Sequence, residues 1–124
     1  MNKITPRIAA AYIRQSAHHK SMSSFEQIAE IKTAAEKHGI TLVESLVFAD
    51  ENTGTTQHRE GFEALKKAGT DGTLQKRGVN TLLFWSTDRI TRSLRDLVSF
   101  EAEMARSGIT CLSAVALRAE EVLS

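Results

Sequence analysis

Polar residues that could carry chemistry follow three short apolar runs of the chain. Arg14, Gln15 and Ser16 come directly after the first run. The two later runs are each followed by an acid and by arginine: Asp50 and Arg59, then Asp88, Arg89 and Arg92. A guanidinium group offers paired donors that match phosphate oxygens, and a serine hydroxyl can act as a nucleophile. These residue types together indicate phosphoryl transfer, in which Ser16 attacks a phosphate held by arginines.

The predicted cluster of arginines needs an anionic partner, because four cations near one point repel one another. Asp50 and Asp88 can supply part of the negative charge, and a bound phosphate can supply more. Phosphoryl transfer depends mainly on positioning and on stabilising charge in the transition state. The arginines suit both tasks, and Ser16 would form a covalent intermediate.

Each candidate residue also has a plainer interpretation. A serine taken alone is more often a loop or capping residue, and Gln27 has the spacing of a capping-box partner for Ser24. Asp88 and Arg89 can form a local ion pair that contributes little if exposed, and Arg59 can be a solvated loop residue. Taken together, these interpretations require polar groups to follow three strands by accident.

The elements that must position these residues alternate between strand and helix. Apolar runs predict strands over residues 8–13, 42–49, 81–85 and 109–115, the last of which can continue into a short helix. Helical patterns over about 25–37, 61–68 and 94–106 separate them, with ends at His38-Gly39 and Ser107-Gly108. This alternation predicts an α/β fold, a three-layer open sandwich around a mostly parallel sheet of about four strands. In such sheets the ligand site lies beyond the carboxyl ends of the strands.

The spacing of apolar residues predicts which side chains of each helix face the core. In chain order, the predicted inner faces hold Phe25, Ile28 and Ala35, then Phe62 and Leu65, then Leu94, Leu97, Val98 and Met104. Ser24 and Gln27 have capping-box spacing for the first helix, and Ser93 can cap the third. The polar and basic stretch 73–80 predicts a connection between elements.

Composition and charge limit the class of protein. A length of 124 residues with 41% hydrophobic and 25% charged residues indicates one globular domain. The formal net charge of +1 lacks the basic excess of most nucleic-acid binders, so any DNA affinity must come from local arginines or from another part. The single cysteine, Cys111, lies in an apolar run and is expected to be a small buried hydrophobe. With no membrane-length apolar run and no signal peptide evident, we expect a soluble, cytoplasmic protein.

Residue spacing does not support two other kinds of site. The segment 14–22 after the first strand contains no glycine, so it lacks both the P-loop and the dinucleotide fingerprint. The histidines show no ligand spacing such as i,i+4 on a helix: His18, His19, His38 and His58. We therefore expect neither a nucleotide cofactor nor a metal ion.

Five segments carry short motifs in a fixed order. Residues 12–16 have the pattern Tyr-x-Arg-x-Ser, and residues 23–27 place a serine four positions before Gln27. Residues 48–54 are close to Asp-x-x-Ser-Gly with Thr53 for serine, and residues 59–62 are close to Arg-Pro-Gly-Phe with Glu60 for proline. Residues 85–92 contain Asp-Arg-x-x-Arg. This set, within a match from about Ile8 to Val115, resembles the catalytic domain of serine site-specific DNA recombinases of the resolvase/invertase family.

The resemblance implies a role for each candidate residue. Ser16 would attack the scissile phosphodiester and form a 5′-phosphoserine link, leaving a free 3′ hydroxyl. Four arginines would hold the phosphate and stabilise the transition state: Arg14, Arg59, Arg89 and Arg92. Asp88 would orient arginines or assist proton movement, Gln27 would support the site, and Asp50 would help to fix Arg14 or Ser16. No metal and no cofactor is implied, because the covalent link conserves the bond energy for rejoining.

The resemblance also implies DNA as the partner and assembly of dimers into a tetramer in a complete recombinase. Only residues 116–124 follow Val115, too few for the family's long helix and separate DNA-binding domain. We therefore expect residues 1–124 to be a catalytic domain without those parts. Two hypotheses stay open: an active domain that exchanges DNA strands, or an inactive truncated remnant that serves as a protein-interaction module.

Overall fold

Four parallel strands form one sheet at the centre of the protein. The computed structural model describes residues 6–16, 23–52, 59–85 and 94–123. The strands are β1 (Arg7–Ser16), β2 (Ile40–Asn52), β3 (Thr81–Phe84) and β4 (Thr110–Ser113), in the order β2-β1-β3-β4. Every neighbouring pair is parallel, so each strand begins at the same edge of the sheet and ends at the other. The predicted parallel sheet of four strands is confirmed.

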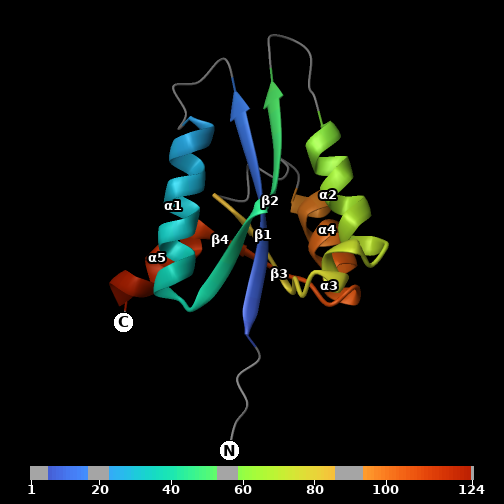
Figure 1. Ribbon diagram of the computed structural model, residues 1–124. Helices are drawn as coiled ribbons and strands as arrows, with labels where there is room; N and C mark the ends of the chain where they lie inside the picture. The colour runs from blue at the N-terminus through green and yellow to red at the C-terminus, as the bar shows by residue number, and fades with distance from the viewer. Residues whose placement is uncertain (1–5, 17–22, 53–58, 86–93, 124) are drawn as a thin grey trace, which may run out of the picture.

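Helices cover both faces of this sheet. Helices α1 (Ser24–Lys37) and α5 (Ala114–Leu123) lie on one face, and α2 (Glu60–Thr70), α3 (Thr73–Lys76) and α4 (Leu94–Arg106) lie on the other (Figure 1). Alternate residues of β1 therefore enter different cores. Ala10 and Tyr12 pack in the core beneath α2 and α4, whereas Ala9, Ala11 and Ile13 pack beneath α1. The three-layer α/β sandwich predicted from the sequence is confirmed.

A bulge in β2 sets the register at the end of the sheet where the candidate residues lie. Ala9 pairs with Leu42, but Ala11 pairs with Val47, so four residues of β2 lie opposite the single residue Ala10. Beyond the bulge the pairing is regular and places Arg14 opposite Asp50. Had the earlier register continued, Arg14 would lie opposite Val47. The bulge thus brings a cation and a carboxylate together across two strands.

The first helix differs from its predicted frame by one residue. Ser23 rather than Ser24 is the N-cap, and its Oγ accepts a hydrogen bond of 3.2 Å from the Glu26 backbone N–H. The predicted capping box of Ser24 and Gln27 is therefore wrong, and Gln27 is fully buried. Phe25, predicted to face the core, is 82% exposed. Because the helix begins one residue earlier than predicted, Gln27 faces the core and Phe25 faces solvent.

The remaining helices confirm part of the predicted core and correct the rest. Phe62, Leu65 and Met104 are buried as predicted, whereas Val98 is 58% exposed, and Phe100, which was not predicted, is buried in the core. The side chains of Leu94 and Leu97, and residue Ser93, lie outside the described residues.

The stretch 73–80, predicted as a connection, contains the short helix α3. Its Leu74 is fully buried in the core beneath α2 and α4. The predicted helix ends are confirmed by positive φ angles of 70° at Gly39 and 81° at Gly108, a conformation that favours glycine. Strand β4 leads directly into α5, as predicted. Among the described helices, none combines the length and the apolar character needed to cross a membrane.

Substitution of Leu74 tests whether α3 belongs to the core. Leu74→Ala is expected to lower the free energy of unfolding by about 2–5 kcal/mol, because it removes a fully buried side chain and leaves a cavity. Urea denaturation followed by circular dichroism measures this loss. The control Val98→Ala, at an exposed position, is expected to change stability by less than about 0.5 kcal/mol. Equal losses in the two variants would contradict the place of Leu74 in the core.

Candidate active site at the carboxyl edge of the sheet

The last residues of β1 and β2 form the frame of the candidate site. Arg14 pairs with Asp50 and Ser16 pairs with Asn52 in neighbouring parallel strands. Ser16 is the final residue of β1, so its backbone lies at the carboxyl edge of the sheet. This edge is where ligand sites occur in open α/β sheets.

Asp50 is a buried carboxylate that joins β1, β2 and α2. It is only 8% exposed, and it accepts three hydrogen bonds. Its Oδ1 accepts from the Gly61 N–H at 2.7 Å, and its Oδ2 accepts from the Phe62 N–H at 2.9 Å and from the Tyr12 hydroxyl at 2.7 Å. A buried charge is tolerated when it is satisfied in this way.

The two backbone donors come from the first turn of α2. N–H groups in the first turn of a helix have no partner within the helix, and the helix dipole favours a negative charge there. Arg59, the N-cap residue of α2, makes no capping hydrogen bond through its side chain. Asp50 supplies the cap from β2 instead. The carboxylate therefore fixes where α2 begins relative to the sheet.

Arg59 lies at this junction between the sheet and α2. Its guanidinium carbon is 4.4 Å from the centroid of the Phe62 ring, within the range of a cation–π contact. The Phe62 ring in turn meets the edge of Tyr12 at a centroid distance of 5.6 Å and an angle of 72°. Phe62 thus links the guanidinium of Arg59 to the core of the protein.

The Tyr12 hydroxyl responds to the charges around it. Burial raises the pKa of Tyr12 above its ordinary value, and the hydrogen bond to Asp50 raises it further. The positive charges of Arg59 and Arg14 act in the opposite direction. Tyr12 therefore stays protonated and donates to Asp50, and both arginines lie close enough to influence it.

Gln27 connects α1 to the carboxyl-terminal end of β1 through a hydrogen bond. Its side chain is fully buried, and its Nε2 donates a hydrogen bond of 3.0 Å to the backbone carbonyl of Arg14. The sequence suggested a capping role for this residue; the structure instead places it against the strand that carries Arg14 and Ser16. Gln27 therefore holds the backbone of β1 near the edge of the sheet.

The structure brings four of the eight candidate residues to one edge: Arg14, Gln27, Asp50 and Arg59. Asp88, Arg89 and Arg92 lie outside the described residues, as does the side chain of Ser16. The role expected for Asp50, to fix Arg14 or Ser16, stays a prediction. Its hydrogen bonds to Gly61 and Phe62 show a further task that the sequence did not indicate.

Tyr12 is a residue of this site that the sequence motif contains but to which sequence reasoning assigned no role. It lies in an apolar run and was counted as part of a buried strand. Two signals pointed to it: its fixed place in the Tyr-x-Arg-x-Ser pattern, and its position two residues before Arg14, since alternate residues of a strand share one face.

Neither the cysteine nor the metal-ligating residue types form a competing site among the described residues. Burial raises the pKa of the Cys111 thiol to about 12, and the negative charge of Glu101 adds to this, so the thiol is neutral near pH 7. Within the described ranges, no three His, Cys, Asp or Glu side chains gather in a way that could hold a metal ion.

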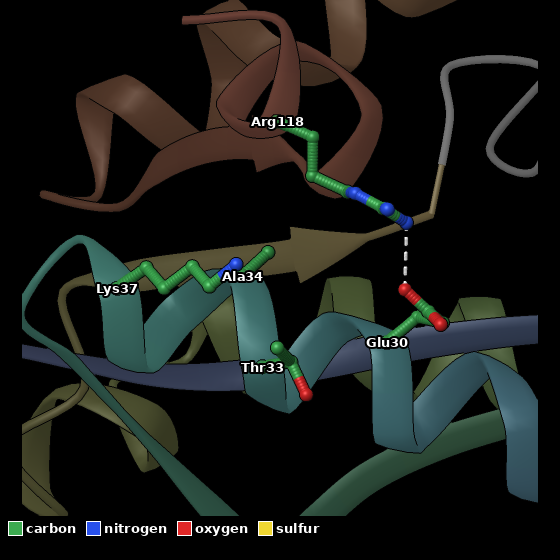
Figure 2. A pocket seen from close by; sticks show the side chains of 5 residues that line it. All are labelled: Glu30, Thr33, Ala34, Lys37 and Arg118. Carbon is green, nitrogen blue, oxygen red and sulfur yellow. Dashed lines mark hydrogen bonds and ion pairs between the residues drawn. The ribbon is translucent and has the colours of Figure 1, made fainter. Parts of the chain in front are cut away.

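A small hollow lies between α1 and α5 (Figure 2). Its volume of about 170 Å³ is below the roughly 300–1,000 Å³ of most small-molecule sites. Arg118 reaches across it to Glu30, with 2.7 Å between Nη1 and Oε2. Both side chains are about half exposed, so this ion pair contributes little. The hollow follows the second half of α1, away from the end of the helix near Ser16.

Comparison with solved structures identifies the class of fold. The chain is similar to the N-terminal catalytic domain of TP901-1 integrase, with a TM-score of 0.68, 22% sequence identity, and coverage of 89% of this chain and 78% of that one. It is also similar to the C-terminal catalytic domain of ISC1926 TnpA, an IS607-like serine recombinase, with a TM-score of 0.66, 22% identity, and coverage of 93% and 77%. The fold is therefore that of a resolvase-like catalytic domain.

The sequence itself assigns the family. Residues 9–119 match the family model described as the N-terminal domain of resolvase, so the chain belongs to this family. A comparison with curated protein sequences gives no match. The resemblance to serine recombinases drawn from the motifs is confirmed, and it indicates site-specific recombination as the general function, with DNA as the partner.

Gly61 provides a test of how closely α2 approaches the sheet. A Cβ atom at this position would lie 2.3 Å from the Ala49 carbonyl oxygen and 3.0 Å from Asp50 Oδ1. Gly61→Ala is therefore expected to lower the free energy of unfolding by about 1–3 kcal/mol, because backbone atoms must move apart. Thermal and urea denaturation measure the loss.

The control is Gly69→Ala in the same helix. There the nearest atom to an added Cβ is Met104 Sδ at 2.8 Å, which belongs to a flexible side chain that can move. The gain in helix propensity of about 0.5–1 kcal/mol offsets part of the cost in both variants. A loss in Gly69→Ala as large as that in Gly61→Ala would contradict the special closeness of α2 and β2 at Gly61.

Proposed function

We propose that this domain breaks and rejoins DNA by serine recombinase chemistry. In the first step, Ser16 Oγ attacks a phosphodiester phosphorus, the bond from phosphorus to the 3′ oxygen breaks, and the 3′ oxygen leaves with a proton. The product is a 5′-phosphoserine link and a free 3′ hydroxyl. After strand exchange, a 3′ hydroxyl attacks the link and releases Ser16. The energy of the phosphodiester is conserved in the link, so the reaction needs no nucleotide cofactor.

One observation supports this proposal above the others. The Asp50 carboxylate holds the start of α2 against the carboxyl edge of the sheet, and this places Arg59 at the edge where β1 carries Arg14 and ends at Ser16. Two arginines at the end of the sheet where β1 finishes suit a phosphate whose charge grows in the transition state.

The remaining candidates complete the proposed site. Arg89 and Arg92 would add donors to the phosphate, and Asp88 would orient them or assist proton movement. Gln27 supports the strand through the Arg14 carbonyl. The family's assembly of dimers into a tetramer on paired DNA sites would apply to this domain as part of a complete recombinase.

The Ser16→Ala variant tests the nucleophile. It is expected to unfold at the same temperature as the wild type but to form no covalent adduct with DNA, because the attacking oxygen is missing. The substrate is a pool of randomised DNA duplexes with sulfur in place of the bridging 3′ oxygen, since the thiolate leaving group rejoins poorly. The adduct is detected by denaturing gel and located by mass spectrometry, with and without an intact recombinase of the family.

The control for Ser16→Ala is Ser45→Ala, which removes a serine hydroxyl in the β2 bulge, several residues before the carboxyl end of that strand. This variant is expected to form adduct at the wild-type level. An adduct in Ser16→Ala would refute Ser16 as the nucleophile. If the wild type forms none even beside an intact recombinase, the alternative of an inactive interaction module is favoured.

The Arg59→Ala variant tests the phosphate-binding role of the guanidinium. The rate of adduct formation is expected to fall by about 100- to 1,000-fold, because charge in the transition state loses a donor. Arg59→Lys is expected to recover only part of the rate, since an ammonium lacks the planar pair of donors. The control is Arg77→Ala, because the Arg77 guanidinium contacts Ser45 rather than the proposed site. This variant should react at the wild-type rate. An ordinary rate in Arg59→Ala would exclude Arg59 from the chemistry.

A further inference from the structure

Tyr12 is a fully buried residue whose hydroxyl has a defined partner. The hydroxyl donates to Asp50 Oδ2 at 2.7 Å, and the ring contacts Phe62 edge-on. The neighbouring buried positions of β1 carry apolar side chains, Ala11 and Ile13. For packing alone, a phenylalanine would fill the same space without the need to satisfy a buried hydroxyl.

The hydroxyl limits the orientation of the Asp50 carboxylate. The two backbone donors of α2 bind different oxygens, Gly61 at Oδ1 and Phe62 at Oδ2. Tyr12 binds Oδ2 from the direction of β1, so that oxygen is held from the strand and from the helix at once. Without the hydroxyl, the carboxylate and the first turn of α2 can shift together relative to β1.

Such a shift would reach Arg59. Phe62, which follows Arg59 by three residues, receives the guanidinium on its ring and donates its N–H to the same Asp50 oxygen that Tyr12 binds. Tyr12 therefore acts on Phe62 in two ways: through the carboxylate and through direct ring contact. Both connections run from β1, the strand that carries Arg14 and Ser16, to the residue that supports Arg59.

We propose that Tyr12 is a positioning residue, whose hydroxyl acts through Asp50 to set the place of the Arg59 guanidinium relative to the end of β1. The binding of a phosphate by Arg59 rests on the proposed function, whereas the position of the Arg59 guanidinium can be tested without it. Tyr12 itself touches neither nucleophile nor phosphate in this role. Its hydroxyl aligns one part of the site with another.

The Tyr12→Phe variant of the full chain tests this role, because it keeps the ring and removes only the hydroxyl. The first readout is the side-chain Nε–Hε resonance of Arg59, which the Phe62 ring current shifts in the wild type. The resonance is assigned by its loss in Arg59→Lys. In Tyr12→Phe it is expected to move toward the position of a solvent-exposed arginine. The control is Thr81→Val, which removes the hydroxyl of a buried residue at the amino end of β3 and should leave Arg59 unchanged.

The second readout is the rate of Ser16 adduct formation on the sulfur-containing DNA pool. The rate constant at saturating DNA is expected to fall by about 10- to 100-fold in Tyr12→Phe, because a displaced guanidinium stabilises the transition state poorly. The DNA concentration at half-maximal rate should change by less than about threefold, since the charge of the site is unchanged. A purely structural role would lower the unfolding temperature without this division between rate and binding.

The outcomes separate the two proposals. If both the Arg59 resonance and the adduct rate of Tyr12→Phe match the Thr81→Val control, the positioning role is overturned. If the wild type forms no adduct, the proposed function fails, and the Arg59 resonance alone decides the role of Tyr12.

If Tyr12→Phe does not unfold cooperatively, 3-fluorotyrosine replaces the variant, since Tyr12 is the only tyrosine in the chain. Its more acidic hydroxyl donates more strongly to Asp50, which should move the Arg59 resonance. An unchanged Arg59 resonance in the fluorinated protein would also overturn the proposal.

Discussion

A single buried carboxylate, that of Asp50, connects the sheet to the helix that begins directly after Arg59. Its two oxygens take one hydrogen bond from a side chain of β1 and two from the backbone of α2. A charge buried without such partners would be strongly destabilising, so these three contacts must form together. The position of Arg59, the packing of Phe62 and the lack of a side chain at Gly61 all follow from them. The site is therefore part of the folded core rather than an addition to its surface.

The bulge in β2 is the second constraint, because it decides which residues meet at the edge. Three extra residues in β2 move the pairing so that Arg14 lies opposite Asp50 instead of Val47. The bulge also carries Glu44, which pairs with Lys32 of α1 at 2.7 Å on the exposed side of an edge strand. Bulges and charges of this kind hinder pairing of an edge strand with another chain. The same irregularity thus sets the register of the site and protects the edge of the sheet.

The alternation of apolar runs and helical patterns was sufficient to predict the layers, the parallel sheet and the edge at which the polar residues gather. The pattern did not predict three details: the cap of α1, the helix α3 and the partner of the Tyr12 hydroxyl. Ser23 and Ser24 are equally good caps in sequence, and the choice of Ser23 turned Gln27 inward and left Phe25 exposed. Leu74 is a lone apolar residue in a polar stretch, so no periodicity marks α3. The hydroxyl of Tyr12 could not be assigned a partner, because its partner depends on the β2 bulge.

The distribution of charge at this edge explains how a domain with almost no net charge can present arginines to a phosphate. The positive end of α2 lies against the carboxylate of Asp50, and Arg14 lies opposite Asp50 in the sheet. The carboxylate neutralises the helix end through the Gly61 and Phe62 N–H groups, so the helix terminus does not compete for an incoming anion. The guanidinium of Arg59 instead rests on the face of Phe62. Groups that are fixed before the substrate arrives need little reorganisation during the reaction, which is the condition under which electrostatic stabilisation of a transition state is largest.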